Sequence, residues 1–154
     1  MNDAAIGFQR IGSTSNSAVG ADFEAFIAEC WKRQGVDLVR NFPVLVGQAG
    51  RSQKLRRFDL GSDDPKIIVE CKSHKWTVGG NMPSAKLTVW TESMYYFSLA
   101  PVDYRKLFCV LTDRRAGRSE TLAEYYVRCY QHLIPMNVEV WEFEAISGQN
   151  VKVI

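Results

Sequence analysis

The sequence predicts one α/β domain built on a mixed sheet of about five strands flanked by helices. Apolar residues recur at helical spacing in three segments, and three extended segments with polar turns between them follow the first. Strands then alternate with helices in the second half, which is typical of crossover connections. The chain has 154 residues, 46% of them hydrophobic, enough for one buried core. We therefore expect a single domain over 17–154, preceded by a flexible arm over 1–16.

The first half of this domain is predicted to be a helix followed by three strands. The spacing of Phe23, Ile27 and Trp31 predicts a helix over 17–35. Three extended segments follow, separated by a Gly-rich turn and by a Gly-Ser-Asp-Asp-Pro turn: 36–46, 54–60 and 66–76. Pro43 marks the first of them as an edge strand, a bulge or a break, because proline cannot donate a hydrogen bond to a neighbouring strand.

The second half is predicted to alternate helices and strands. Helices are expected over 84–100 and 119–134, and strands over 106–113 and 137–146. The complete order is helix, strand, strand, strand, helix, strand, helix, strand. The purpose of residues 135–154 is left open, since their strand either completes the sheet or pairs two subunits.

Composition narrows the class of protein. No apolar run approaches the ~18 residues that cross a membrane, and the N-terminal stretch has no basic start followed by an apolar run. Four widely spaced cysteines without a Cys-x-x-Cys pair, and only two histidines, argue against a zinc site and favour reduced thiols. We therefore expect a cytoplasmic protein with no membrane partner.

An acid and a base stand at the end of a strand that is otherwise apolar. Glu70 and Lys72 follow the run 67–69, and the alternation of side chains along a strand places both on one face. The preceding strand brings Asp59 toward Glu70 across a short turn. Two neighbouring carboxylates repel each other unless a cation lies between them, and Mg²⁺ is a cation that such oxygens bind. The pattern indicates a metal site; the alternative is an Asp/Glu/Lys salt-bridge cluster.

Neighbouring residues differ in how well they are placed to join this site. At 100° per residue, Glu24 lies at the margin of the apolar stripe of the first helix, whereas Asp22 and Glu29 point toward solvent. His74 shares the face of Glu70 and is interpreted as an ordinary histidine at a strand end; contact with a phosphate is the alternative. Lys75 is predicted to point to the opposite side. Glu24 is therefore the third acid that we expect at the site.

These residues resemble the core motif of a known nuclease superfamily. The stretch "FDLGSDDPKIIVECK" is similar to the motif of the PD-(D/E)xK superfamily, the restriction-endonuclease-like phosphodiesterases, with Asp59, Glu70 and Lys72 at the motif positions. Glu24 matches the acid common in the family's first helix, and Phe58 stands where the family name has proline. The family core is a helix, three meandering strands, a helix and a further strand, which is the order predicted here over 18–113.

The resemblance implies a fold and a chemistry. It implies a restriction-endonuclease-like core and a metal-dependent DNA endonuclease that hydrolyses phosphodiester bonds. Asp59, Glu70 and the backbone carbonyl of Cys71 would hold Mg²⁺ or Mn²⁺. Lys72 would orient the attacking water or stabilise the transition state, and Glu24 would assist. These four side chains (Glu24, Asp59, Glu70 and Lys72) are the predicted catalytic residues.

DNA contacts are expected from two basic clusters and one helix start. Local groups of arginine and lysine can follow a phosphate backbone, and the N-terminus of a helix offers free N–H groups to an anion. The predicted contacts are Arg56, Arg57, Ser84, Lys86, Arg114 and Arg115. Solvated loops are the alternative for the arginines, and an ordinary helix cap is the alternative for Ser84.

Other functions stay open at this point. A catalytically inactive nucleic-acid-binding module with the same fold is the main alternative to a DNA endonuclease. A nuclease for RNA is a third, although no aromatic sheet platform for reading RNA is recognisable. The family resemblance also implies a homodimer, since cutting both strands of a duplex takes two active sites.

Overall fold

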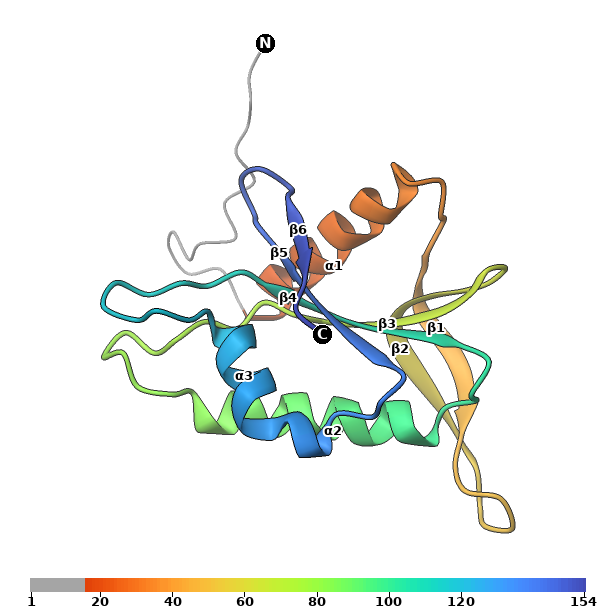
Figure 1. Cartoon of the computed structure of the whole chain (residues 1–154). Coiled ribbons are helices and arrows are strands. Elements are labelled where there is room, and N and C mark those ends of the chain that lie inside the picture. Colours follow the sequence, from red (N-terminus) through yellow and green to blue (C-terminus); the bar gives the residue numbers. More distant parts are fainter. Residues whose placement is uncertain (1–15) are drawn as a thin grey trace.

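The computed structural model describes residues 16–154 as a three-layer α/β fold (Figure 1). In chain order the elements are α1 (Asn16–Lys32), β1 (Val39–Val46), β2 (Lys54–Asp63), β3 (Lys66–Lys72), α2 (Ser84–Leu99), β4 (Arg105–Leu111), α3 (Leu122–Tyr130), the 3₁₀ turn η1 (Gln131–Leu133), β5 (Val138–Phe143) and β6 (Asn150–Lys152). The predicted arm lies outside the described residues, except that Asn16 begins α1.

The strands form one open, mixed sheet whose spatial order follows the chain, from β1 at one edge to β6 at the other. The β1–β2, β2–β3 and β5–β6 pairs are antiparallel, whereas β3, β4 and β5 are parallel and are connected through α2 and α3. Helix α1 lies on one face of the sheet, and α2 and α3 lie on the other (Figure 1). The predicted α/β class with a mixed sheet is confirmed.

The sheet has six strands where about five were expected. The additional strand, β6, has only three residues, all exposed, so it lacks the alternation that reveals a strand in a sequence. It pairs with β5 and closes that edge, so residues 135–154 complete the sheet within one chain. At the opposite edge, the exposed Pro43 lies in β1, as its missing N–H group requires.

Two apolar layers enclose the sheet. On the α2 side, Trp90 is completely buried and packs against Phe108 and Tyr126 at ring-centroid distances of 5.4 and 5.1 Å. On the α1 side, Phe23 and Ile27 cover the alternate residues of the central strands. Trp90 is therefore core packing, as its place on the apolar stripe predicts. All four cysteines are free thiols, which also agrees with the sequence analysis.

At Asp59, the side chains of β2 change the face of the sheet on which they pack. Phe58 packs on the α2 side, but Leu60, two residues later, packs on the α1 side. Regular alternation would keep the two side chains together, so β2 twists between them. Across the hairpin Asn41 has a φ of 52°, in the left-handed region that asparagine tolerates better than most residues. This twist turns the Asp59 carboxylate away from a regular position in the sheet.

Two boundaries differ from the predicted ones for identifiable reasons. Strand β3 ends at Lys72, since the chain then turns inward to bury Trp76. Helix α3 begins after Thr121, whose side chain accepts the N–H of Glu124 in a complete capping box, three residues later than expected. No helix within residues 16–154 is long and apolar enough to cross a membrane.

We predict that Gly61→Ala destabilises the protein. Gly61 is buried in β2, and an added Cβ would collide with the side chain of Phe42, itself part of the core. Overpacking of this kind costs about 1–3 kcal/mol. The free energy of unfolding, measured by urea denaturation, should fall by that amount. Gly20→Ala in α1 is the matched control: it meets no atom within 4 Å and should raise stability by about 0.5–1 kcal/mol. Equal effects of the two substitutions would contradict this packing.

Candidate functional site

The candidate site is built around Glu70, a charged residue with only 1% of its surface exposed. Its Oε1 accepts a hydrogen bond from Arg56 Nη2 at 3.1 Å, and its Oε2 accepts from Lys72 Nζ at 2.9 Å. The hydroxyl of Ser93 on α2 donates to the same Oε2 at 3.4 Å. A buried carboxylate without such partners would cost several kcal/mol, so β2, β3 and α2 together satisfy this one charge.

Lys72 is shared between two carboxylates. Its ammonium lies 2.9 Å from Glu70 and 3.7 Å from Asp59 Oδ2, and its side chain is 14% exposed. Burial alone would lower the pKa of Lys72, but the two carboxylates outweigh burial and raise it. Lys72 therefore stays protonated at neutral pH and serves as the cation between the two acids.

The Asp59 side chain bonds to β3 just beyond the point where the regular pairing of β2 with β3 ends. Regular pairing of β2 with β3 ends at Leu60 and Val69, and the Asp59 Oδ2 then accepts the N–H of Cys71 at 2.7 Å. Burial, and after it the nearby Glu70 carboxylate, raises the pKa of Asp59 to about 6. Lys72 and the bond from Cys71 act in the opposite direction without cancelling the effect. The sequence-predicted approach of Asp59 to Glu70 is thus present.

Glu24 reaches the site from α1. Its Oε2 accepts a hydrogen bond from Arg40 Nη2 at 2.8 Å, and its side chain is 23% exposed. Arg40 lies on β1, so this ion pair joins the first helix to the edge strand. The helix therefore brings Glu24, and no other acid of α1, to the pocket described next.

An open pocket of about 460 Å³ lies between the first turns of α1 and α2 at the end of β3. Its lining residues are Val19, Gly20, Glu24, Asp59, Cys71, Lys72, Ser73, His74, Lys75, Lys86 and Val89. Glu70 is not among them, since it lies one layer deeper beneath Lys72. Lys75, predicted to point to the opposite side, lines the pocket instead because β3 has ended before it. The pocket thus combines two acids with three lysines.

His74 enters the pocket as a neutral acceptor. Trp90 Nε1 donates a hydrogen bond to His74 Nδ1 at 2.8 Å. Burial, and then the charges of Lys86 and Lys72, lower the pKa of His74 to about 4. The imidazole is therefore uncharged at neutral pH and is fixed by the core. His74 lies beyond the end of β3 and has a structural partner in Trp90, and its contact with a phosphate stays a prediction.

The residues fit a hard divalent cation in donor type. Within residues 16–154, no group of three or more His, Cys, Asp or Glu side chains is arranged to hold a metal ion. Asp59 and Glu70 nevertheless share one cation, the Lys72 ammonium, so positive charge already lies between them. Carboxylate and carbonyl oxygens are the ligands of Mg²⁺. A metal ion held by both acids would have to displace the contact between Lys72 and Glu70.

The two arginines predicted on β2 have different surroundings. Arg56 points inward, where it binds Glu70 and lies over the ring of Tyr96, 4.0 Å from its centroid. A phosphate would have to compete with both contacts. Arg57 is exposed and donates to the backbone carbonyl of Asn41 at 3.2 Å. It keeps most of its donors for a ligand.

The arginines of the second cluster mainly hold loops together. Arg115 donates to the carbonyls of Thr77 and Val78, and Arg118 donates to the carbonyl of Gly80 at 2.7 Å. Arg114 is half exposed and donates to the carbonyl of Ser119 at 2.6 Å. These contacts join the loop after β3 to the loop after β4, beside the pocket. Of the arginines predicted there to bind DNA, Arg114 is the more accessible.

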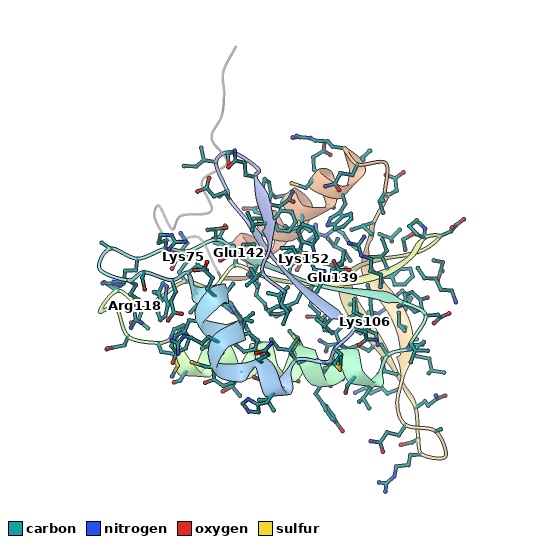
Figure 2. The ribbon with its side chains drawn as sticks, viewed as in Figure 1. Lys75, Lys106, Arg118, Glu139, Glu142 and Lys152 are labelled. Atoms are coloured by element: carbon teal, nitrogen blue, oxygen red, sulfur yellow. The ribbon has the colours of Figure 1, made fainter. Side chains whose placement is uncertain are left out.

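Figure 2 shows Arg118 and Lys75 near this end of the sheet, and Lys106 near the other end. Arg118 lies over Trp76, 3.9 Å from the ring centroid, and Trp76 is buried. Trp76 is therefore covered by protein and does not offer a free face for stacking on a base.

Ser84 and Lys86 occupy the first turn of α2. Pro83 is the cap residue of this helix, and no side chain caps it, so the alternative interpretation of Ser84 as an ordinary helix cap is wrong. Ser84 is exposed, and Lys86 lines the pocket. The backbone N–H groups of Ser84 and Lys86 already donate to the carbonyls of Met82 and Pro83, so the Lys86 ammonium is the main feature here that suits an anion.

Sequence reasoning missed Arg56 and Ser93 as partners of Glu70. The alternation that places Phe58 on the α2 side also places Arg56 there, so this signal was available in β2. Ser93 was visible as a polar residue within the apolar stripe of α2, beside Trp90 and Met94. Arg40, the partner of Glu24, gave no such signal, because it depends on how α1 crosses the edge of the sheet.

No protein-family model matches this chain, and neither the curated proteins nor the solved structures contain a significantly similar one.

We predict that Asp59 controls part of the pH dependence of stability. Its folded pKa of about 6 lies above the unfolded value of 3.8, so this group favours the folded state below pH 4 and loses that contribution as pH rises through 6. Asp59→Asn keeps an acceptor for the Cys71 N–H and removes the titration. The free energy of unfolding of Asp59→Asn, relative to the unmodified protein, should rise by roughly 2 kcal/mol between pH 4 and pH 8.

Urea denaturation at each pH measures this difference. Asp63→Asn, an exposed acid at the end of the same strand, serves as the control. A difference that stays constant with pH for Asp59→Asn would show that the Asp59 carboxyl titrates normally.

Proposed function

We propose that this protein is a metal-dependent DNA endonuclease with its active site at the end of β3. The observation that carries the proposal is the Lys72 ammonium shared by Asp59 and Glu70 beside an open pocket. Acids and bases with shifted pKa values cluster at catalytic sites, and Asp59 and Lys72 combine such shifts with a place on the pocket wall.

The order of elements supports a restriction-endonuclease-like core. A helix, a three-stranded antiparallel meander, a second helix and a parallel strand follow one another from α1 to β4. Asp59 lies in the second strand of the meander, and Glu70 and Lys72 lie in the third. The residues that resemble the PD-(D/E)xK motif therefore stand on the elements that the resemblance implies.

Asp59, Glu70 and the Cys71 carbonyl are the residues that would hold Mg²⁺ or Mn²⁺. Such an ion lowers the pKa of a bound water and stabilises charge on a phosphate. Lys72 is protonated and would be free to face the pocket once its contact with Glu70 is released, where it stabilises negative charge on the reacting phosphate. Lys75 and Lys86, on the same pocket wall, bind neighbouring phosphates, and Glu24 orients water from α1.

Arg57, Ser84 and Arg114 remain candidate DNA contacts on the exposed surface. Arg56 and Arg115 act first on the protein itself, where they hold Glu70 and the loop after β3. Cleavage of both strands of a duplex takes two active sites, so we include a homodimer in the proposal. We also propose that the protein acts in the cytoplasm.

A second candidate function has an observation in its favour. Glu70 is already fully satisfied by Arg56, Lys72 and Ser93, so the cluster is stable without a metal ion. A nucleic-acid-binding module that does not cut DNA would need only such a metal-free cluster. Cleavage assays separate the two functions.

We predict that Lys72→Met abolishes cleavage of supercoiled plasmid DNA. The unmodified protein should nick the plasmid with Mg²⁺ or Mn²⁺ and should not do so in EDTA. Loss of the charge next to the reacting phosphate should lower the rate by at least about 100-fold, the scale of a single electrostatic contribution to catalysis. Agarose-gel assays of nicking over time measure the rates.

Two further variants complete this test. Lys32→Met changes an exposed lysine in the last turn of α1 and should cut like the unmodified protein. Asp59→Asn should lose cleavage even if Lys72→Met proves unstable, and circular dichroism verifies the folding of each variant. Binding of DNA without cutting under all metal conditions would favour the inactive module.

A further inference from the structure

The hairpin formed by β1 and β2 concentrates the positive charge of the chain. Residues 39–58, here called the basic hairpin, carry five basic side chains and no acidic one. The whole chain has 19 basic and 17 acidic side chains, so the remainder holds three more acids than bases. A positive arm on a negative body attracts a polyanion in one orientation.

Three of the five cations are available to a ligand. Arg40 and Arg56 are bound to Glu24 and Glu70. Within the described chain, Arg51, Lys54 and Arg57 are exposed and have no acidic partner. Arg51 and Lys54 lie at the turn and at the start of β2, and Arg57 lies further along β2, opposite Pro43. The free positive charge therefore extends from the turn along the hairpin.

One face of the hairpin packs on the core, and the other face is exposed to solvent. Val44 and Val46 pack on the core beneath, and the N–H of Gly47 donates to the carbonyl of Leu99 at the end of α2 at 3.1 Å. On the other face, Leu45 and Leu55 are cross-strand neighbours and are 51% and 54% exposed. Helix α1 covers the central strands and leaves this face open, and the turn projects from the rest of the sheet (Figure 1).

We propose that the basic hairpin enters the major groove of duplex DNA. The major groove is about 12 Å wide and admits a two-stranded ribbon, whose strands are about 4.8 Å apart before side chains are added. The free cations contact the phosphates on both sides of the groove. Leu45 and Leu55 face the base edges, where apolar side chains contact the methyl group of thymine.

The hairpin also connects this groove to the pocket. Asp59 follows the hairpin directly in β2, and Arg40 joins it to Glu24 on the pocket wall. A duplex held by the hairpin therefore passes close to the candidate active site. The inference extends the proposed function by naming duplex DNA as the ligand and the hairpin as the element that binds it, and it does not depend on cleavage.

The test is duplex binding in EDTA, measured by fluorescence anisotropy with a labelled 24-base-pair DNA at several salt concentrations. The triple variant Arg51→Gln, Lys54→Gln, Arg57→Gln should bind about tenfold or more weakly at 0.1 M salt. The slope of log K against log salt should decrease in magnitude by about 2.7, since each phosphate contact contributes about 0.9.

The matched control removes three exposed cations elsewhere: Lys32→Gln, Arg33→Gln, Lys152→Gln. It has the same net charge as the hairpin variant and should bind within about twofold of the unmodified protein. An equal loss of duplex affinity in both triple variants would show that only net charge matters and would overturn the proposal. The absence of duplex binding by the unmodified protein would also overturn it. Thermal unfolding verifies that both variants are folded.

A second measurement tests the groove. Methyl green, which occupies the major groove, should displace the protein, whereas netropsin in the minor groove should not. Duplex RNA should bind more weakly, because its major groove is deep and too narrow for a ribbon. Equal binding to duplex RNA, or displacement by netropsin alone, would overturn placement in the major groove.

These experiments distinguish a failure of the hairpin proposal from a failure of the endonuclease proposal. If the hairpin variant loses binding in EDTA but no protein cuts DNA with metal, the inference stands and the endonuclease does not. If metal-dependent cutting is found and the hairpin variant binds normally, the endonuclease stands and DNA is bound by another surface.

Discussion

The neutralisation of one buried carboxylate, Glu70, is the constraint on which the rest of the site depends. Burying an ion costs several kcal/mol even after the protein relaxes, so the cost must be offset by close partners. Arg56 from β2, Lys72 from β3 and Ser93 from α2 supply them, and each comes from a different element. The separation of β2, β3 and α2 is therefore fixed at this point. Removing either cation would leave Glu70 with a single charged partner beneath the pocket and would weaken the contact between the elements that shape it.

A second feature, the twist of the first hairpin, links the site to the surface. Because β2 changes face between Phe58 and Leu60, Asp59 leaves the regular pairing and bonds the Cys71 N–H instead. The same twist separates the outer hairpin from the sheet that α1 covers. One local change of direction thus aims an acid into the pocket and exposes a basic ribbon beside it. Asn41 makes it possible, because its left-handed conformation would strain most other residues.

Most of the fold follows from the sequence, and much less of the site does. Helical spacing of apolar residues located α1, and apolar runs bounded by turn residues located the central strands β3 and β4, which are buried on both faces. Strand β6 has no apolar face, and its existence depends on β5 offering a free edge. Glu70 and Lys72 could be placed together from strand alternation alone. Strand alternation also indicated the face to which Arg56 points, although not that Glu70 would be its partner. Whether Arg115 faces solvent or the protein could not be predicted, since its partners lie in the loop at 77–80, distant in sequence.

The charge balance of the site changes with pH in a way that bears on both candidate functions. Below pH 6 Asp59 is largely protonated, so Glu70 faces two cations, Arg56 and Lys72, and the cluster is positive. Above pH 6 Asp59 adds a negative charge, and Lys72 serves two carboxylates at once. An additional cation is then electrostatically favoured beside Asp59, where the pocket is open to solvent. Asp59 holds β3 through the Cys71 N–H and pairs with Lys72, but its raised pKa shows that burial and Glu70 outweigh these contacts for the charged form. This charge balance is the physical basis of the metal site proposed at Asp59.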